Sequence, residues 1–126
     1  RMDRSVGRII DKLKELKLDK DTIVLFTSDN GPTYDRLGGA DSEFFNSAAG
    51  LRGRKGSLYE GGIRVPLIVR WPGKIEPGRV SDLPCAAYDL MPTLCELAET
   101  KDPQNLDGIS LSPTLTGQGK QRPHET

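Results

Sequence analysis

The sequence contains a single histidine, His124, and only two cysteines, Cys85 and Cys95, among its 126 residues. His124 lies in a stretch rich in proline and polar residues, so a histidine general base and a Ser-His-Asp triad are not predicted. The two cysteines are not in a CxxC spacing, which excludes the common zinc motifs. They either pair in an oxidising compartment or remain thiols, and we favour the thiols.

Net charge and long apolar runs are also missing. Eighteen lysines and arginines balance eighteen aspartates and glutamates, so no overall field attracts nucleic acid or an anionic membrane surface. No apolar run approaches the roughly 20 residues that cross a bilayer. We therefore expect no nucleic-acid partner and no membrane span, and any charged ligand must be bound by local groups.

The apolar residues that are present indicate an α/β chain of one modest domain. Apolar residues at steps of three and four predict an amphipathic helix over residues 2–16. The β-branched and apolar run 22–27 predicts a strand covered on both faces, as in a parallel sheet. A second strand is predicted over 65–70, and Asp89 is a candidate N-cap for a following helix.

Two segments have no sustained period. Residues 31–50 contain two adjacent glycines and many polar residues, and they predict a long surface loop. Residues 102–126 are rich in proline, glycine, serine and threonine, and they predict an irregular connector.

An acid and an amide, Asp29 and Asn30, follow the first predicted strand directly. Ligands of open α/β sheets bind at the carboxyl ends of the strands, so the position suits a site. Carboxylate and amide oxygens are ligands for calcium or magnesium, but either ion needs at least about six ligands. The competing interpretation is a turn, because Asp-Asn-Gly-Pro are the commonest turn residues for backbone reasons alone.

A glycine-rich basic segment over residues 50–62 is the second candidate site. Its five glycines allow a close approach of the backbone to a ligand, and Lys55 offers a mobile ammonium for a sulfate or phosphate oxygen. The alternative is a solvated basic loop, because a glycine-rich pattern without a fixed template is weak evidence.

In this order, four segments resemble consecutive parts of the type I sulfatase family of the alkaline-phosphatase superfamily. They are "MDRSVGRIIDKLKELKLDKDTIVLFTSDNGP", "GLRGRKGSLYEGGIRVPLIVRWPGKI", "YDLMPTLCELAE" and "LDGISLSPTLTG". The resemblance implies a part of an alkaline-phosphatase-like sandwich, with a mostly parallel sheet flanked by helices. By the same resemblance, residues 1–117 are the C-terminal portion of a sulfatase catalytic domain, and 118–126 connect to a further C-terminal subdomain.

The resemblance also implies the roles of three residues. Asp29 and Asn30 would be ligands of calcium, with magnesium as the alternative, and Lys55 would be the catalytic and substrate-binding contact to the sulfate group. Family members carry an upstream Cys- or Ser-x-Pro-x-Arg motif, whose first residue becomes the formylglycine nucleophile. Cys85 and Cys95 lack that context. We therefore expect sulfate-ester hydrolysis by a longer protein, and no activity of this chain alone.

The resemblance leaves several expectations about the longer protein. Its substrate would be a sulfate ester, with a sulfated glycan as one candidate, and a periplasmic or secreted location would fit the family. This chain alone would be marginally stable or would self-associate, because the neighbouring strands would come from the upstream part of the longer protein. The first alternative is a phosphoester or phosphonate hydrolase of the same superfamily. The second is a non-catalytic structural or interaction module that pairs through exposed sheet edges.

Overall fold

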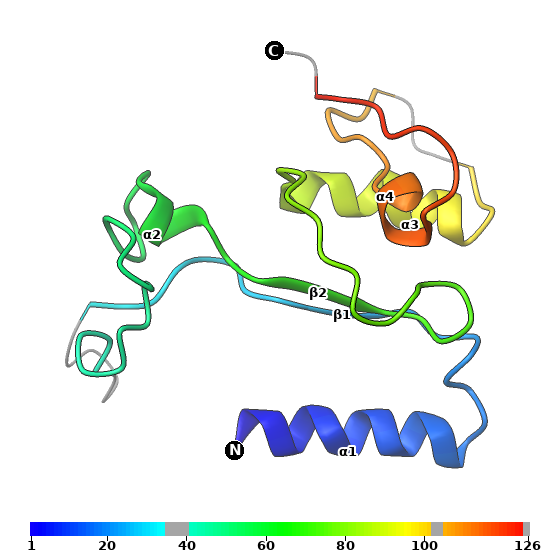
Figure 1. Cartoon of the computed structure of the whole chain (residues 1–126), viewed down its shortest axis with the longest axis horizontal. Helices are drawn as coiled ribbons and strands as arrows, with labels where there is room; N and C mark the ends of the chain where they lie inside the picture. Colours follow the sequence, from blue (N-terminus) through cyan, green and yellow to red (C-terminus); the bar gives the residue numbers. More distant parts are fainter. Residues whose placement is uncertain (35–40, 102–104, 125–126) are drawn as a thin grey trace. The chain divides into compact units, whose positions relative to one another are not determined.

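The computed structural model describes residues 1–34, 41–101 and 105–124 (Figure 1). Contacts between residues divide the chain into two compact units. The first unit comprises Arg1–Ile23 and Arg70–Thr126, and the second comprises Val24–Val69. The two units are described separately below.

The first unit begins with helix α1, Met2–Glu15, which confirms the predicted amphipathic helix. Asp3 in its first turn, and Lys12 and Lys14 in its last turn, complement the helix dipole. No residue of α1 is buried, and Ile9 on its apolar side is 58% exposed. The apolar face that the sequence predicted is therefore present, but it is largely uncovered.

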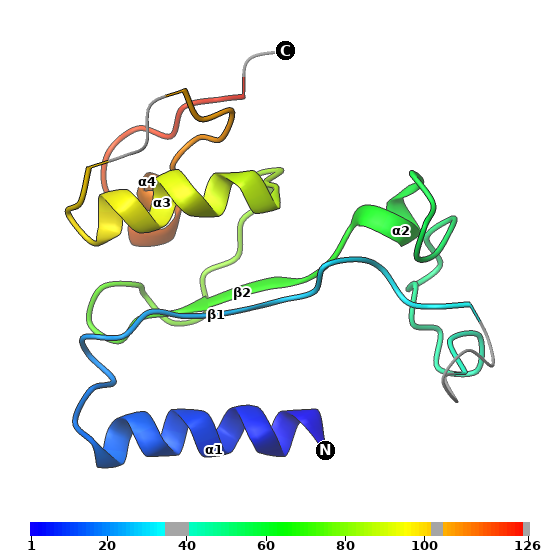
Figure 2. The same cartoon turned by 180° about the vertical axis from the view of Figure 1, so that it is seen from behind.

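The second unit is built around a two-stranded sheet of β1, Val24–Thr27, and β2, Leu67–Arg70. Both strands lie where the sequence predicts them, and Pro66 precedes the first residue of β2. The strands run antiparallel (Figures 1 and 2), so the described strands do not confirm the predicted parallel sheet. The intervening segment returns the chain in the opposite direction, and the three apolar residues of β1 are half-buried rather than fully covered.

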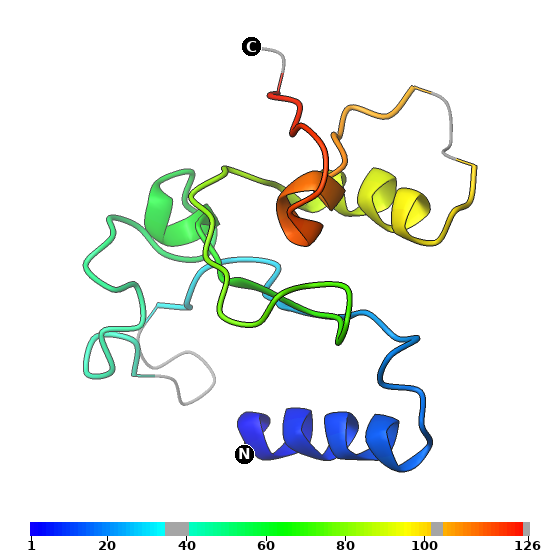
Figure 3. The same cartoon turned by 45° about the vertical axis from the view of Figure 1, so that its right-hand side comes forward.

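The rest of the first unit consists of short helices packed against one another. They are the 3-10 helix η2, Ala87–Asp89, and the helices α3, Leu90–Leu97, and α4, Ser112–Thr116. Helix α4 contacts α3 (Figure 3). The prediction of an irregular connector over 102–126 missed α4, because a five-residue helix is too short to show a period.

Asp89 precedes α3 as predicted, but its side chain forms no hydrogen bond to cap that helix. The carboxylate is fully buried. It accepts hydrogen bonds from the backbone N–H groups of Ala86 at 2.8 Å and Ile109 at 2.9 Å. His124 Nε2 lies 3.1 Å from Asp89 Oδ2. Asp89 therefore links three segments that are distant in sequence.

The neighbouring Thr93 is also fully buried. Its hydroxyl donates to Asp89 O at 2.6 Å and accepts from Leu111 N–H at 2.8 Å. Leu111 and Pro92 are the buried apolar side chains of the described chain. The centre of this unit is therefore held by satisfied polar groups, with little apolar area buried around them.

Both cysteines are free thiols in the structure. Partial burial of the Cys85 thiol raises its pKa, and the nearby Asp89 carboxylate adds to this effect by charge repulsion. A thiol of raised pKa is a weak nucleophile at neutral pH.

Among the described residues, no helix is long and apolar enough to cross a membrane.

Candidate functional site

Asp29 and Asn30 occupy the turn that follows β1, where the sequence places them. Ser28 Oγ donates to Asn30 O at 2.9 Å, and the Asn30 side-chain nitrogen donates to Gly31 O at 2.9 Å. Asp29 is exposed, and Asn30 is half-buried. The amide nitrogen of Asn30 is engaged with the backbone, so the amide oxygen is the end of this side chain that could accept a further interaction.

The turn is packed directly against the glycine-rich segment. Gly31 N–H donates to Gly62 O at 2.9 Å, and the two backbones are so close that a Cβ at Gly31 would collide with Gly61 O. A Cβ at Gly61 would in turn collide with Gly53 O. Only glycine permits these approaches, so the glycines bring two distant segments together. Helix α2, Glu60–Ile63, contains Gly61 and Gly62 and is part of this contact.

Lys55, in the glycine-rich segment, contacts the residue that follows the turn through its backbone. Its backbone N–H donates to Pro32 O at 2.8 Å, and the flanking Gly53 and Gly56 take left-handed conformations, with φ of 85° and 87°. The Lys55 side chain is exposed, and within residues 1–34, 41–101 and 105–124 it forms no ion pair. Its ammonium is therefore not committed to a carboxylate there.

The structure thus brings the backbone of Lys55 beside the turn that carries Asp29 and Asn30. In the described parts of the chain, no hydrogen bond or ion pair joins the three side chains. The same parts contain no group of three or more His, Cys, Asp or Glu residues able to hold a metal ion. The arrangement places a carboxylate and an amide side chain on the turn beside the backbone of Lys55, but it is not a full metal site.

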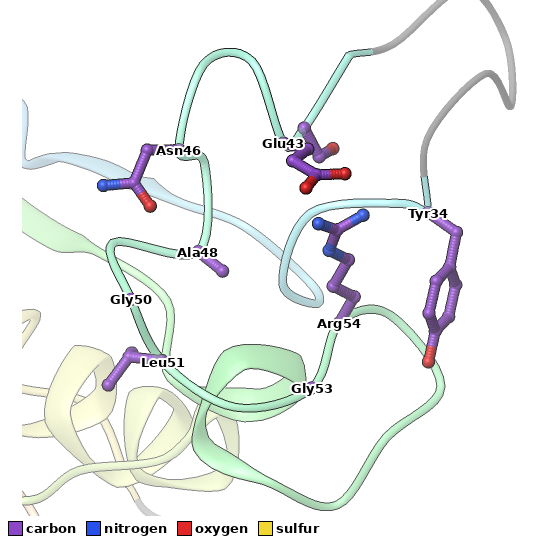
Figure 4. Close-up of a pocket in the computed structure, with 9 residues that line it drawn as sticks. Tyr34, Glu43, Asn46, Ala48, Gly50, Leu51, Gly53 and Arg54 are labelled. Atoms are coloured by element: carbon purple, nitrogen blue, oxygen red, sulfur yellow. The ribbon is translucent and has the colours of Figure 1, made fainter.

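A cavity of about 360 Å³ lies in the same unit (Figure 4). Its lining includes Tyr34, Glu43, Asn46 and Arg54. Glu43 and Arg54 point toward one another in Figure 4, and the Arg54 guanidinium carbon lies 5.9 Å from the centre of the Tyr34 ring. The sequence did not indicate this cavity, because its lining combines Tyr34 and part of 42–48 with the glycine-rich segment.

Arg52 has a different environment from Arg54. Its guanidinium carbon lies 3.7 Å from the centre of the Tyr59 ring, which is a cation–π contact. Arg52 is exposed, whereas Arg54 is half-buried. Two arginines two residues apart are thus held by different aromatic rings, and only Arg54 lines the cavity.

The model of the sulfatase family matches residues 1–100. This chain belongs to the sulfatase family. It is 41% identical over 126 residues to mouse steryl-sulfatase, a match that covers 98% of this chain and 20% of that protein. The chain spans 20–22% of the length of the mouse, human and rat steryl-sulfatases.

Solved structures agree with this family membership. The crystal structure of Ps i-CgsB in complex with k-i-k-neocarrahexaose matches with a TM-score of 0.75 and 36% identity, over 89% of this chain and 24% of that one. The structure of BT4656 in complex with its substrate D-glucosamine-2-N,6-O-disulfate matches with a TM-score of 0.72 and 30% identity, over 95% and 22%. The phosphonate monoester hydrolase of Silicibacter pomeroyi matches with a TM-score of 0.70 and 31% identity, over 94% and 21%. The segment therefore has the fold of this family.

The glycine contact gives a testable prediction. Gly31→Ala should lower the free energy of unfolding by about 1–3 kcal/mol, because the added methyl group overlaps backbone that cannot move aside. Denaturant unfolding followed by circular dichroism measures the change. Gly7→Ala in α1 is the matched control. A methyl group there meets no atom, and it should stabilise the helix by about 0.5–1 kcal/mol. Equal stability of the two variants would contradict the proposed close contact.

Proposed function

We propose that this chain is a segment of a longer sulfatase that hydrolyses sulfate monoesters. Asp29 and Asn30 are two of its metal ligands, and Lys55 contacts the sulfate group. The observation that supports this proposal is the glycine contact, because it holds the Lys55 backbone against the turn of Asp29 and Asn30 through the bond to Pro32. Two candidate sites that are separate in sequence thereby become neighbours.

The side chains of Asp29 and Asn30 have oxygen atoms of the kind that bind a hard divalent cation. One carboxylate and one amide oxygen are ligand types that calcium prefers, and the engaged nitrogen of Asn30 fixes which end of the amide is available. A calcium or magnesium ion held there would polarise the ester and stabilise negative charge. The two residues supply a minority of a shell of about six to eight ligands. The remaining ligands would come from other parts of the longer protein and from water.

Lys55 has the properties of a substrate contact. An exposed ammonium on a segment with flanking glycines can reach a tetrahedral anion without a clash of neighbouring side chains. Its charge would stabilise the sulfate oxygens as charge develops on the ester. The nucleophile would be a formylglycine from the upstream part of the longer protein, since neither Cys85 nor Cys95 stands in the required motif.

The small apolar core supports the proposal that the chain works within a longer protein. Leu111 and Pro92 are the buried apolar side chains of the described chain, and α1 buries none of its residues. A stable domain needs far more apolar burial than this. In a complete sandwich, β1 would be part of a mostly parallel sheet, and that sheet would cover the apolar face of α1. The chain alone would associate through these surfaces.

The substrate class that we propose is a sulfated sugar. It is supported by the similarity to BT4656, whose structure contains D-glucosamine-2-N,6-O-disulfate. The second candidate function is hydrolysis of phosphonate or phosphate monoesters, which the similarity to the Silicibacter pomeroyi enzyme favours. A metal and a lysine that bind tetrahedral oxyanions discriminate little between these esters, so the test has to compare them directly.

The experiment uses the full-length protein that contains these residues. We expect 4-nitrophenyl sulfate to be hydrolysed with a higher kcat/KM than a 4-nitrophenyl phosphonate ester. Removal of metal with EDTA should abolish turnover, and calcium should restore it. Asp29→Ala should raise the calcium concentration required for half-maximal activity, because a charged ligand is lost.

Asp21→Ala is the control for the metal experiment, because Asp21 is also exposed but precedes β1. It should keep the parental calcium requirement. A higher kcat/KM on the phosphonate ester would favour the second function. An unchanged calcium requirement of Asp29→Ala would show that Asp29 is not a ligand.

A further inference from the structure

We propose that Ser57 is a positioning residue for Lys55, because its hydroxyl group holds the turn from which the Lys55 ammonium reaches the substrate. This inference rests on the proposed sulfatase function, in which Lys55 contacts the sulfate group. It adds a residue that acts through Lys55 and does not touch the substrate itself. Ser57 lies two residues after Lys55 and is half-buried, whereas Lys55 is exposed. The exposed side chain is available to a ligand, and the half-buried one is placed to hold the backbone.

The backbone of Ser57 closes the turn that carries Lys55. Ser57 N–H donates to Arg54 O at 2.9 Å, so Lys55 and Gly56 are the two central residues of this turn. Gly56 has a φ of 87°, and a positive φ at the second central position is typical of a type II turn. Lys55 N–H is itself bound to Pro32 O at 2.8 Å. The backbone of Lys55 is therefore fixed by its own bond and by the bond that closes the turn.

The hydroxyl group of Ser57 connects the same turn to helix α2. Ser57 Oγ accepts a hydrogen bond from Tyr59 N–H at 3.1 Å, and Tyr59 is the N-cap residue of α2. Tyr59 O in turn accepts a hydrogen bond from Gly62 N–H at 2.7 Å. A serine hydroxyl that binds the backbone two residues further on favours one path of the chain. The Ser57 side chain therefore fixes how the chain passes from the turn of Lys55 into α2.

Close backbone packing surrounds Ser57. A Cβ at Gly53 would collide with Ser57 Oγ, and a Cβ at Gly62 would collide with Ser57 O. Tyr59 is 50% exposed, so water can replace the hydroxyl group as the acceptor for its N–H, and the loss in stability should be small. The turn would nevertheless lose one of its constraints. Since a small misplacement of a binding group lowers the reaction rate strongly, activity should fall more than stability.

The test is a double-mutant cycle in the full-length protein. Ser57→Ala is expected to lower kcat/KM for 4-nitrophenyl sulfate by about two- to tenfold, because one hydrogen bond that orients the turn is lost. When Lys55 is already replaced by alanine, Ser57→Ala should cause no further loss, since the ammonium that it positions is absent. Ser57→Thr should stay within about twofold of the parent, because threonine retains the hydroxyl group.

Ser81→Ala is the matched control, because Ser81 Oγ accepts the same kind of bond from Leu83 N–H at 3.2 Å in the other unit. It should leave kcat/KM unchanged, and thermal unfolding should show similarly small shifts for both alanine variants. Unchanged activity of Ser57→Ala, or equal losses with and without Lys55, would overturn the positioning role while the sulfatase function stands. A loss in Ser57→Thr as large as that in Ser57→Ala would also overturn it. Absence of turnover by the parent would overturn the proposed function itself.

Discussion

Replacing Asp89 by alanine is expected to lower the free energy of unfolding by about 3–5 kcal/mol. The fully buried carboxylate accepts hydrogen bonds from Ala86 and Ile109, and its removal leaves two backbone N–H groups without their acceptor. His124 loses its partner at 3.1 Å as well. Asp89→Asn should cost less, because the amide oxygen can still accept one of the bonds. Thermal and denaturant unfolding of the variants measure these differences.

Asp82→Ala is the control for this prediction. Asp82 is exposed in the same unit, so its removal should change stability by less than about 0.5 kcal/mol. His124→Ala should fall between the two, since it removes one contact and leaves both backbone bonds to Asp89. If Asp89→Ala were as stable as Asp82→Ala, the linking role of the carboxylate would be wrong.

Lys55→Ala in the full-length protein is expected to lower kcat/KM for 4-nitrophenyl sulfate by about 10- to 150-fold. This range corresponds to about 1.5–3 kcal/mol for a hydrogen bond to a charged group. Stability should change little, because the Lys55 side chain is exposed and its backbone bond to Pro32 survives the substitution. Steady-state kinetics and thermal unfolding of the same preparation separate the two effects.

Two variants serve as controls for Lys55. Arg52→Ala removes a cation from the same segment, but Arg52 is held over Tyr59, so the loss of activity should be milder. Lys74→Ala removes an exposed lysine from the other unit and should leave activity unchanged. Near-parental turnover of Lys55→Ala, together with a large loss of turnover in Arg52→Ala, would show that Lys55 is not the sulfate contact.

The sequence by itself determined the elements whose signal lies within a short window. The period of apolar residues predicted α1, and the β-branched run predicted β1. The order of the motifs indicated the sulfatase family, which the match over residues 1–100 confirms. Asp29, Asn30 and Lys55 were candidates from residue type and position alone, and their roles stay predictions.

Only the tertiary structure decided how distant segments meet. The antiparallel pairing of β1 with β2 depends on the path of the long segment between them. Asp89 has the sequence signature of an N-cap, yet its partners Ile109 and His124 lie 20 and 35 residues away. Arg54 and Arg52 look alike in sequence but contact different aromatic rings. Local propensity depends on neighbouring residues, whereas contacts like these depend on the closure of loops whose paths no short window specifies.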